Sequence, residues 1–551
     1  MPASRAKRAP GARPARALTP SGRSPGQAAR KPPPVWAVGA RLTGMLLDEL
    51  VGAAAAVAST RSRLAKVDAL AGVLRGLTSD ELAPAVGFLL GKPRQGRVGV
   101  GWRGLAKATA DPAAEPTLTI ADVDAFLDGL VALAGAGSAE RRTAMMREFT
   151  ARATAREQDF LGRMLLGEMR TGALEGVLID AVARAADEPG PLVRRAAMLS
   201  GDLGETARLA LAGEPGALEG VGLVVGRPVL PMLAATAPTA TDALATTGEA
   251  SVEFKLDGAR IQVHRQGDEV RVFTRNLADI TRRLPEVVEV VRAMPAEAVI
   301  LDGETLALDE NDAPRPFQDT MSRFGAEAAR EAVLHPWFFD VLHLDGRDLI
   351  DEPLAVRRAE LERIAPTHRI PGIVTDDPAA AEQVSRDALA AGHEGVVVKA
   401  VDSTYAAGRR GSSWVKVKPV HMYDLVVLAA EWGYGRRTGW LSNLHLGALD
   451  PVGEFGEPGG FVMVGKTFKG LTDALLRWQT EYFQEIETGR TAGAVRVAPV
   501  TVVEIAIDGV QRSTRYPGGV ALRFARVKRY RDDKAPADAD TIQSLRELLR
   551  G

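Results

Sequence analysis

The chain has 551 residues, 46% of them apolar, so we expect about three or four domains with sizeable cores. No stretch reaches the roughly 18 apolar residues that a membrane helix needs, and the absence of cysteine excludes disulfides and thiolate zinc sites. The net charge of −1 by itself argues against a nucleic-acid partner, but the charges are unevenly distributed.

Residues 1–36 are predicted to be a disordered basic tail, rich in alanine, proline, glycine and arginine. Its first 31 residues hold eight basic side chains and no acidic one, which leaves −1 − 8 = −9 for the rest of the chain. Basic arms of this kind often bind nucleic-acid phosphates weakly. An inert extension is the alternative, and the prolines argue against a transit peptide.

Residues 37–234 are predicted to form an all-helical domain. Thr78 and Glu81 have the spacing of a capping box, and Thr119 and Asp122 repeat it. Apolar residues follow the second box at helical spacing: Val123, Phe126, Leu127 and Leu130. Few β-branched runs occur in this region, which favours helices throughout.

Residues 235–418 are predicted to form a mixed α+β domain. The stretch ARIQVHRQGDEVRVFTR alternates about Gly267 and Asp268, which indicates a β-hairpin. Further strands are expected at AVILDGETLAL, WFFDVLHL and HEGVVVKA. Helices are expected between the strands, at RRLPEVVEVVRAM, LAVRRAELERI and DPAAAEQVSRDALAAG.

Residues 419–551 are predicted to form a small β-barrel followed by a C-terminal helix. The expected strands are DLVVLAAEW, LHLGALD, GFVMVGK, TVVEIAID and ALRFARVKRY, and glycine-rich turns separate them. Five or so short strands in about 115 residues are typical of such a barrel. The stretch TIQSLRELLR has the pattern of an amphipathic helix.

The stretch EFKLDGARIQVHR places unusual residues at the end of a predicted strand. Burial of the Lys255 stem would favour the neutral amine, which is a nucleophile, and Arg260 would act in the same direction. Asp257 acts in the opposite direction unless a metal occupies it. Gly258 permits a tight backbone turn near a bulky ligand. The alternative for this motif taken alone is a lysine in a surface ion pair.

Carboxylates and cations gather at the ends of other predicted strands of the same domain. Asp302, Glu304 and Glu394 are carboxylates of the kind that can bind Mg²⁺. Basic residues recur at Arg409, Arg410, Lys416 and Lys418, and alternation places the two lysines on one face, where an anion would separate them. Each cluster taken singly fits a solvated strand edge, but together they predict a phosphate-binding pocket with an amine nucleophile.

In this order, the motifs KLDGAR, TRN, LDGE, FFD, EGVVVK and KVK resemble the six nucleotidyltransferase signatures of the ATP-dependent DNA ligases. RFARVKRYRDDK resembles their final barrel motif, with Ala525 where many relatives have proline, and PMLA also fits. The resemblance covers about residues 37–545. It is strongest to the bacterial branch with a helical N-terminal DNA-binding domain, and it implies an adenylation domain and an OB-fold barrel.

The resemblance implies that Lys255 attacks the α-phosphate of ATP to form lysyl-AMP, which then adenylylates the 5′-phosphate of a nick. It implies that further residues line the nucleotide site: Glu253, Arg260, Arg275, Glu304, Phe339, Arg410, Lys416 and Lys418. Phe339 matches the ring that stacks on adenine, with Phe338 as the second choice. Glu394, and next Asp257, are the implied ligands of Mg²⁺, for which Mn²⁺ can substitute.

In the barrel, the resemblance implies that Arg531, Asp533 and Lys534 orient the pyrophosphate leaving group in the first step. The barrel would then rotate away to clamp DNA, about a hinge at residues 417–421. The loop at 433–443 offers Arg436 and Arg437 to phosphates, or is an ordinary basic surface loop.

The implied partners are ATP and nicked duplex DNA, with no membrane, and a monomer in the bacterial cytoplasm near the nucleoid is expected. An RNA ligase or mRNA-capping enzyme shares the lysine and the barrel but usually lacks the large helical domain. A non-catalytic DNA-binding protein would have lost key residues, which are present here. The absence of cysteine argues against an NAD-dependent ligase with its four-cysteine zinc site.

Overall fold

The computed structural model describes residues 44–549 apart from short segments. The residues outside the description are 1–43, 97, 136, 168, 170–173, 311–312, 316–318, 322–332, 407–409, 434–436, 468–470, 492 and 550–551. The predicted basic tail therefore lies outside the described residues. No helix within the described part of the chain is long and apolar enough to cross a membrane.

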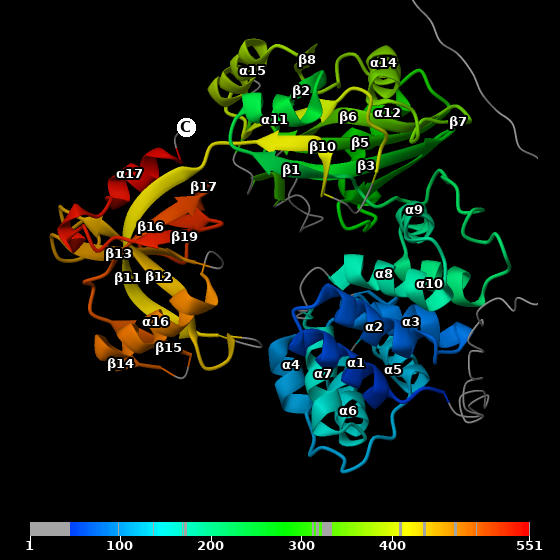
Figure 1. Cartoon of the computed structure of the whole chain (residues 1–551), viewed down its shortest axis with the longest axis horizontal. Helices are drawn as coiled ribbons and strands as arrows, with labels where there is room; N and C mark the ends of the chain where they lie inside the picture. The colour runs from blue at the N-terminus through cyan, green and yellow to red at the C-terminus, as the bar shows by residue number, and fades with distance from the viewer. Residues whose placement is uncertain are drawn as a thin grey trace, which may run out of the picture. The chain divides into compact units, whose positions relative to one another are not determined.

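Ten helices precede the first strand of the described chain, which confirms the all-helical N-terminal region (blue to cyan in Figure 1). They are α1 (Leu47–Ser59), α2 (Arg63–Leu74), α3 (Ser79–Leu90), α4 (Trp102–Ala108), α5 (Ile120–Ala132), α6 (Ser138–Ala151), α7 (Ala155–Leu165), α8 (Leu174–Ala186), α9 (Gly190–Ser200) and α10 (Leu203–Ala212). Both predicted capping boxes are present, at the starts of α3 and α5. The apolar face expected on α5 is buried in one core that is shared by the bundle.

The region after the helices contains two five-stranded sheets, of order β1-β10-β9-β2-β8 and β4-β3-β5-β6-β7. The strands are β1 (Leu233–Ala237), β2 (Ala250–Lys255), β3 (Ala259–Gln266), β4 (Glu269–Thr274), β5 (Ala298–Ala307), β6 (Leu334–Leu344), β7 (Arg347–Asp348), β8 (Gly372–Thr375), β9 (Gly395–Ala400) and β10 (Arg410–Val417). Its helices include α11 (Ala240–Thr247), α12 (Pro285–Arg292), α14 (Leu354–Ile364) and α15 (Pro378–Ala390). The mixed α+β prediction is confirmed.

The predicted hairpin is formed by β3 and β4, which pair in antiparallel register from Gln266 opposite Glu269. Strand β2 pairs with β9 so that Lys255 lies opposite Gly395. This pairing brings the KLDGAR and EGVVVK motifs together although about 140 residues separate them. Strand β1 begins at Leu233, two residues before the predicted domain start at residue 235.

Helix α14 is fastened to β6 by a fully buried ion pair. The Nε of Arg357 donates to Asp340 Oδ1 at 2.7 Å, and both side chains have no exposed surface. Nη1 of Arg357 also donates to the carbonyl oxygens of Glu352 and Ser403. Because Asp340 follows Phe339 directly, this pair fixes the strand that presents the aromatic ring.

The C-terminal region is β-rich, as predicted, with strands β13, β12, β11, β16 and β19 adjacent in that order. The elements are β11 (His421–Trp432), β12 (Leu441–Asp450), β13 (Gly460–Lys466), α16 (Asp473–Glu485), β14 (Glu487–Arg490), β15 (Ala494–Val497), β16 (Val502–Ile507), β17 (Gly509–Arg512), β18 (Val520–Arg523), β19 (Arg526–Tyr530) and α17 (Ile542–Glu547). This order, with a helix after the third strand, is that of an OB-fold.

One expectation for the barrel is wrong, and one helix was not predicted. ALRFARVKRY is two strands, β18 and β19, because Phe524 has a φ of +54°, a left-handed conformation that ends a strand. Helix α16 was not predicted, although Thr472 caps it by accepting from the Leu475 N–H.

Candidate active site

Lys255 lies at the end of β2 and forms an ion pair with Glu394, the residue before β9. The two residues are also joined through the backbone, because the Glu394 N–H donates to the Lys255 carbonyl oxygen at 2.9 Å. Both side chains are mostly buried, with 24% and 16% of their surface exposed. The Lys255 amine therefore lies in direct contact with a carboxylate.

Glu253 and Phe339 lie on either side of a buried lysine that the sequence did not assign. The Nζ of Lys399 is 2.5 Å from the Glu253 carboxylate and 4.3 Å from the centroid of the Phe339 ring. Trp414 adds a second ring, at 4.4 Å from the same Nζ. The cation is stabilised by the faces of both rings and by the carboxylate. These residues form a box of aromatic and charged groups beside Lys255.

The family resemblance favours Phe339 over Phe338 as the stacking ring, and the two rings have different surroundings in the structure. Phe338 has no exposed surface and belongs to the core between β5, β6 and α12. Phe339 is half-buried, and its ring lies 5.4 Å from the Arg260 guanidinium carbon as well as against Lys399. Phe339 is therefore the ring that faces the charged residues of the pocket.

Arg260 is held by Asp302 on the neighbouring strand. Its Nε and Nη2 donate to the two carboxylate oxygens of Asp302, at 3.0 and 2.6 Å. Its Nη1 donates to the carbonyl oxygen of Met232 at 2.7 Å. Burial alone would lower the pKa of Arg260, but the adjacent Asp302 raises it above its ordinary value. The arginine is a fixed cation at the edge of the pocket.

Glu304 lies two residues along β5 from Asp302, in register with Arg260. Burial raises the pKa of Glu304 to about 7, against the opposing influence of Lys255 and Arg260. A carboxyl group with this pKa changes its protonation near neutral pH. Perturbed carboxyl groups of this kind are concentrated at functional sites.

Asp257 and Glu394 both lie near one cation of the barrel, the guanidinium of Arg523. Arg523 Nη1 is 2.7 Å from the Asp257 carboxylate, and Nη2 is 3.7 Å from Glu394. Burial opposes ionisation of Asp257, but the Arg523 guanidinium holds the pKa of Asp257 below its ordinary value. Two carboxylates that share one positive charge form a site that favours a cation.

Gly258 is required by the close approach of strand β5, and the expected role beside a ligand stays a prediction. A Cβ at this position would lie 2.5 Å from the carbonyl oxygen of Thr305 on β5. The chain has to cross β5 at this distance because β3, which follows, pairs with β5 along its whole length.

Comparisons with known proteins identify the family. Family models match in chain order: DNA ligase N terminus at residues 109–183, ATP dependent DNA ligase domain at 231–418, and ATP dependent DNA ligase C terminal region at 437–534. The "Probable DNA ligase" of Pseudarthrobacter chlorophenolicus is 72% identical over 506 residues, which cover 92% of this chain and 100% of the relative. This chain belongs to the ATP-dependent DNA ligases.

A second relative, the "Probable DNA ligase" of Saccharopolyspora erythraea, is 57% identical over 504 residues, covering 92% of this chain and 98% of its own. Among solved structures, Pmar-Lig_PreS3 matches with a TM-score of 0.58 and 18% identity, over 88% of this chain and 99% of its own, which shows a shared fold. The match of the helical region to the ligase N terminus decides against the RNA ligase and capping enzyme considered from the sequence.

Several of the cations predicted to bind phosphate in this ligase have other surroundings in the structure than the pocket around Lys255. Lys418 lies beyond the end of β10 and pairs with Asp508 of the barrel at 2.5 Å, a carboxylate that also pairs with Arg526. Lys416 lies within β10, next to Thr236 of β1. Arg275 is exposed in the turn after β4. Arg409, Arg436 and the side chain of Arg410 lie outside the described residues.

The final barrel motif of the ligase is paired within the barrel. Arg531 forms a two-pronged ion pair with Asp533, at 2.8 and 2.7 Å, and also donates to Asp424 at 2.8 Å. Lys534 donates to the same Asp424 oxygen at 2.7 Å. The Arg531 guanidinium holds the pKa of Asp533 well below its ordinary value. Asp424, on β11, is thus the common counter-charge of this motif.

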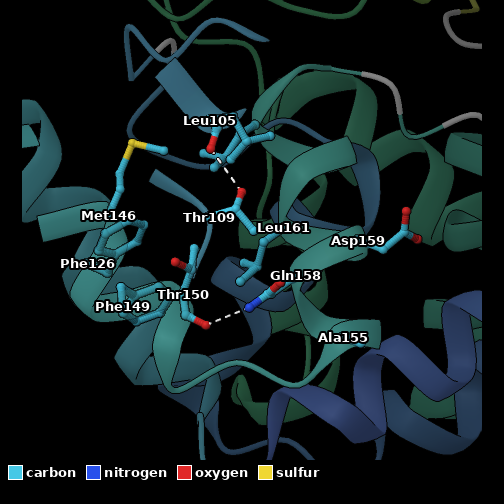
Figure 2. Close-up of a pocket in the computed structure, with 11 residues that line it drawn as sticks. Leu105, Thr109, Phe126, Met146, Phe149, Thr150, Ala155, Gln158, Asp159 and Leu161 are labelled. Atoms are coloured by element: carbon cyan, nitrogen blue, oxygen red, sulfur yellow. Dashed lines mark hydrogen bonds between the residues drawn. The ribbon is translucent and has the colours of Figure 1, made fainter. Parts of the chain in front are cut away.

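A cavity of about 250 Å³ lies in the helical domain, away from these residues in the sequence (Figure 2). Its polar side chains are bonded within its wall: Gln158 donates to the Thr150 carbonyl oxygen, and the Thr109 hydroxyl donates to that of Leu105. Asp159, the carboxylate of the lining, pairs with Arg163. The cavity is mainly apolar, and its lining residues present no unpaired charged group for catalysis.

Several residues of the ligase site were not predicted from the sequence. Some of them stand in recognised motifs, and others have no motif around them. Lys399 stood inside the recognised EGVVVK motif but received no role. Asp302 was noted only as a carboxylate at a strand end. Arg523 opens the recognised RFARVKRYRDDK motif but likewise received no role. Tyr405, Trp414 and Asp424 carried no local signal, because each meets its partner only through the tertiary fold.

Proposed function

We propose that this ligase seals nicks with 3′-hydroxyl and 5′-phosphate ends in duplex DNA through a lysyl-AMP intermediate on Lys255. The Lys255 Nζ attacks the α-phosphate of ATP, so that an N–P bond forms while the bond to pyrophosphate breaks. AMP then passes to the 5′-phosphate of the nick. The 3′-hydroxyl attacks that phosphate, a phosphodiester forms, and AMP leaves.

The observation that carries this proposal is the environment of the Lys255 amine. It lies at the end of a buried strand, in contact with Glu394 and in the field of Glu304. An ammonium has no lone pair, so Lys255 has to lose a proton before it attacks. Glu394 is within hydrogen-bond reach of Nζ and is the acceptor that the geometry favours.

The box of aromatic and charged groups is proposed to bind adenine. Phe339 offers a ring face for stacking, and Glu253 offers a buried carboxylate as acceptor for the amino group of the base. Lys399 holds both groups in place through its ion pair and its contact with the ring. Arg260 and Glu304 are assigned to the ribose and phosphate side of the same nucleotide.

Asp257 and Glu394 are proposed to hold Mg²⁺. The donor set fits, because Mg²⁺ is commonly bound by one or two carboxylates together with substrate phosphates, and both groups already share the Arg523 cation. No group of three or more potential metal-ligating side chains occurs among the described residues, so phosphate and water oxygens would complete the shell. When bound, the ion supplies positive charge to the phosphate oxygens, and Mn²⁺ has similar ligand preferences.

Arg531, Asp533 and Lys534 are proposed to act on the pyrophosphate in the first step, with Lys416, Lys418 and Arg410 on the nucleotide phosphates. We also infer that the helical domain and the barrel bind duplex DNA, that the ligase acts as a monomer on chromosomal DNA in the cytoplasm, and that it serves repair, recombination or replication. Because Lys418 and the barrel motif are ion-paired within the protein, a ligand has to displace these partners.

The test is incubation of the full chain with Mg²⁺ and ATP labelled at the α-phosphate, followed by addition of nicked duplex DNA. We expect a labelled protein adduct that loses its label to the DNA as the nick is sealed. ATP labelled at the γ-phosphate is the matched control and should leave the protein unlabelled. An adduct that persists in Lys255→Ala would contradict the assignment, and label that never reaches DNA would contradict nick sealing.

A further inference from the structure

Tyr405 is a buried residue that connects two halves of the nucleotide site. It lies between β9 and β10, and only 2% of its surface is exposed. Its hydroxyl donates to Asp302 Oδ2 at 2.6 Å and accepts from the Met232 N–H at 3.0 Å. Its ring meets the edge of Trp414 at 5.8 Å, with 87° between the planes. The hydroxyl therefore faces the Arg260 side of the site, and the ring faces the box that contains Phe339.

Arg260 depends on these same groups for its orientation. Among the residues that the structure describes, four of its N–H donors find partners, two on Asp302, one on Met232 and one, at 3.3 Å, on the Tyr405 hydroxyl. A guanidinium has five N–H donors. One N–H, on Nη1, is therefore left for a ligand, and the direction in which it points is set by the three partners.

The hydroxyl oxygen of Tyr405 lies at the centre of this hydrogen-bond network, in contact with Asp302, Met232 and Arg260. Asp302 receives three hydrogen bonds in total, two from Arg260 and one from Tyr405, so the carboxylate cannot rotate without breaking one of them. Met232 is also bound twice, because its N–H donates to Tyr405 and its carbonyl oxygen accepts from Arg260. Burial and the adjacent Asp302 raise the pKa of Tyr405 well above its ordinary value, so the hydroxyl keeps its proton and remains a donor.

We propose that Tyr405 is a positioning residue for nucleotidyl transfer, which holds the Asp302 carboxylate and, through it, aims the free N–H of Arg260 at the nucleotide. This inference rests on the proposed lysyl-AMP chemistry at Lys255 and adds a residue outside the recognised motifs. Tyr405 itself does not touch the reacting atoms. Its effect reaches the nucleotide through Asp302 and Arg260.

A purely structural Tyr405 would contribute through its ring, and Tyr405→Phe separates the two roles. Phenylalanine keeps the contact with Trp414 and removes the hydroxyl alone. If the hydroxyl aims Arg260, the rate of adenylylation at saturating ATP should fall about 10- to 100-fold, since small misplacements of catalytic groups have effects of this size. The KM for ATP should change less than about threefold, because the adenine box is intact.

The experiment measures lysyl-AMP formation against ATP concentration for the wild type, Tyr405→Phe, Asp302→Asn and the double variant. If the hydroxyl acts through Asp302, the double variant should equal Asp302→Asn within about twofold, because effects along one path do not add. Sealing of a nick that already carries AMP should fall in parallel, since the same AMP site is used. Tyr482→Phe, which removes a hydroxyl bonded to Thr501 in the barrel, is the matched control.

The inference is overturned if Tyr405→Phe lowers only the Tm while adenylylation is unchanged, or if the effects of Tyr405→Phe and Asp302→Asn multiply. If Tyr405→Phe does not fold, the inference is tested with Asp302→Asn alone. This variant must then lower the adenylylation rate without changing the KM for ATP. Absence of lysyl-AMP in the wild type would instead refute the underlying chemistry, so the two failures are distinguishable.

Discussion

The pocket around Lys255 and the barrel motif both consist of paired charges, but they are paired in different ways. In the pocket, each pair joins residues from separate motifs, such as Lys255 with Glu394 and Glu253 with Lys399, and most members are buried. In the barrel, Arg531 divides its hydrogen bonds between the distant and mostly buried Asp424 and its near neighbour Asp533, which is 60% exposed. Buried pairs between distant segments fix geometry, whereas exposed local pairs can exchange partners with a ligand.

This difference indicates a division of work. The pocket is organised before a ligand arrives, as electrostatic catalysis requires. The barrel motif is balanced by Asp424 and becomes available when a phosphate competes for Arg531 and Lys534. The predictions below test whether the pocket serves every step and the barrel motif only the first.

The largest effect is expected from Lys255→Ala, which should abolish the covalent AMP adduct because no amine remains at the end of β2. Lys255→Arg should fail as well, since a guanidinium stays protonated and cannot attack. The measurement is protein labelling with α-labelled ATP, and Lys528→Ala, an exposed lysine of β19, should label like the wild type. Normal labelling of Lys255→Ala would show that Lys255 is not the nucleophile.

The next largest effect concerns the barrel. The double variant Asp533→Ala, Lys534→Ala should slow adenylylation about 100- to 1000-fold, the usual effect of removing groups that stabilise developing charge. It should still seal a nick whose 5′ end already carries AMP, because that substrate bypasses ATP. Both rates are measured on one preparation, so misfolding would reduce both. An equal loss in the two assays would show that the barrel motif is not specific to the first step.

A smaller effect is expected from Phe339→Leu, which should raise the KM for ATP about tenfold by removing the ring face beside Lys399. Phe338→Leu is the matched variant one residue away. It should leave the KM unchanged and lower the Tm, because Phe338 is fully buried in the core. If Phe338→Leu raised the KM and Phe339→Leu did not, Phe338 would be the ring that contacts the nucleotide.

The smallest effect is a pH dependence of stability from Glu304. Its pKa of about 7 in the folded chain exceeds the ordinary value of 4.5, so the stability it contributes is fully present below pH 4.5 and is lost as the pH rises through 7. The loss amounts to at most about 3 kcal/mol. The Tm of the wild type should therefore fall relative to Glu304→Gln between pH 5 and 8. Parallel Tm curves would mean that Glu304 titrates normally.

Local sequence patterns were sufficient for much of the molecule. Capping boxes located α3 and α5, alternation located the β3–β4 hairpin, and the glycine-rich breaks separated most barrel strands. Alternation also indicated that only one of Phe338 and Phe339 points into the core, and Phe338 is the fully buried one. These features succeed because a few neighbouring residues determine them. The domain boundaries and the roles of the site residues remain predictions.

Other features were decided only by the tertiary structure. Lys255 meets Glu394 because β2 pairs with β9, and Asp302 meets Tyr405 across 103 positions of the sequence. Arg523 reaches Asp257 across 266 positions. The sequence by itself determined which chemical groups this ligase carries and which strands and helices present them. Which charge balances which depended on the folded chain, because ion pairs and buried hydrogen bonds depend on distance in space, and no local pattern specifies that distance.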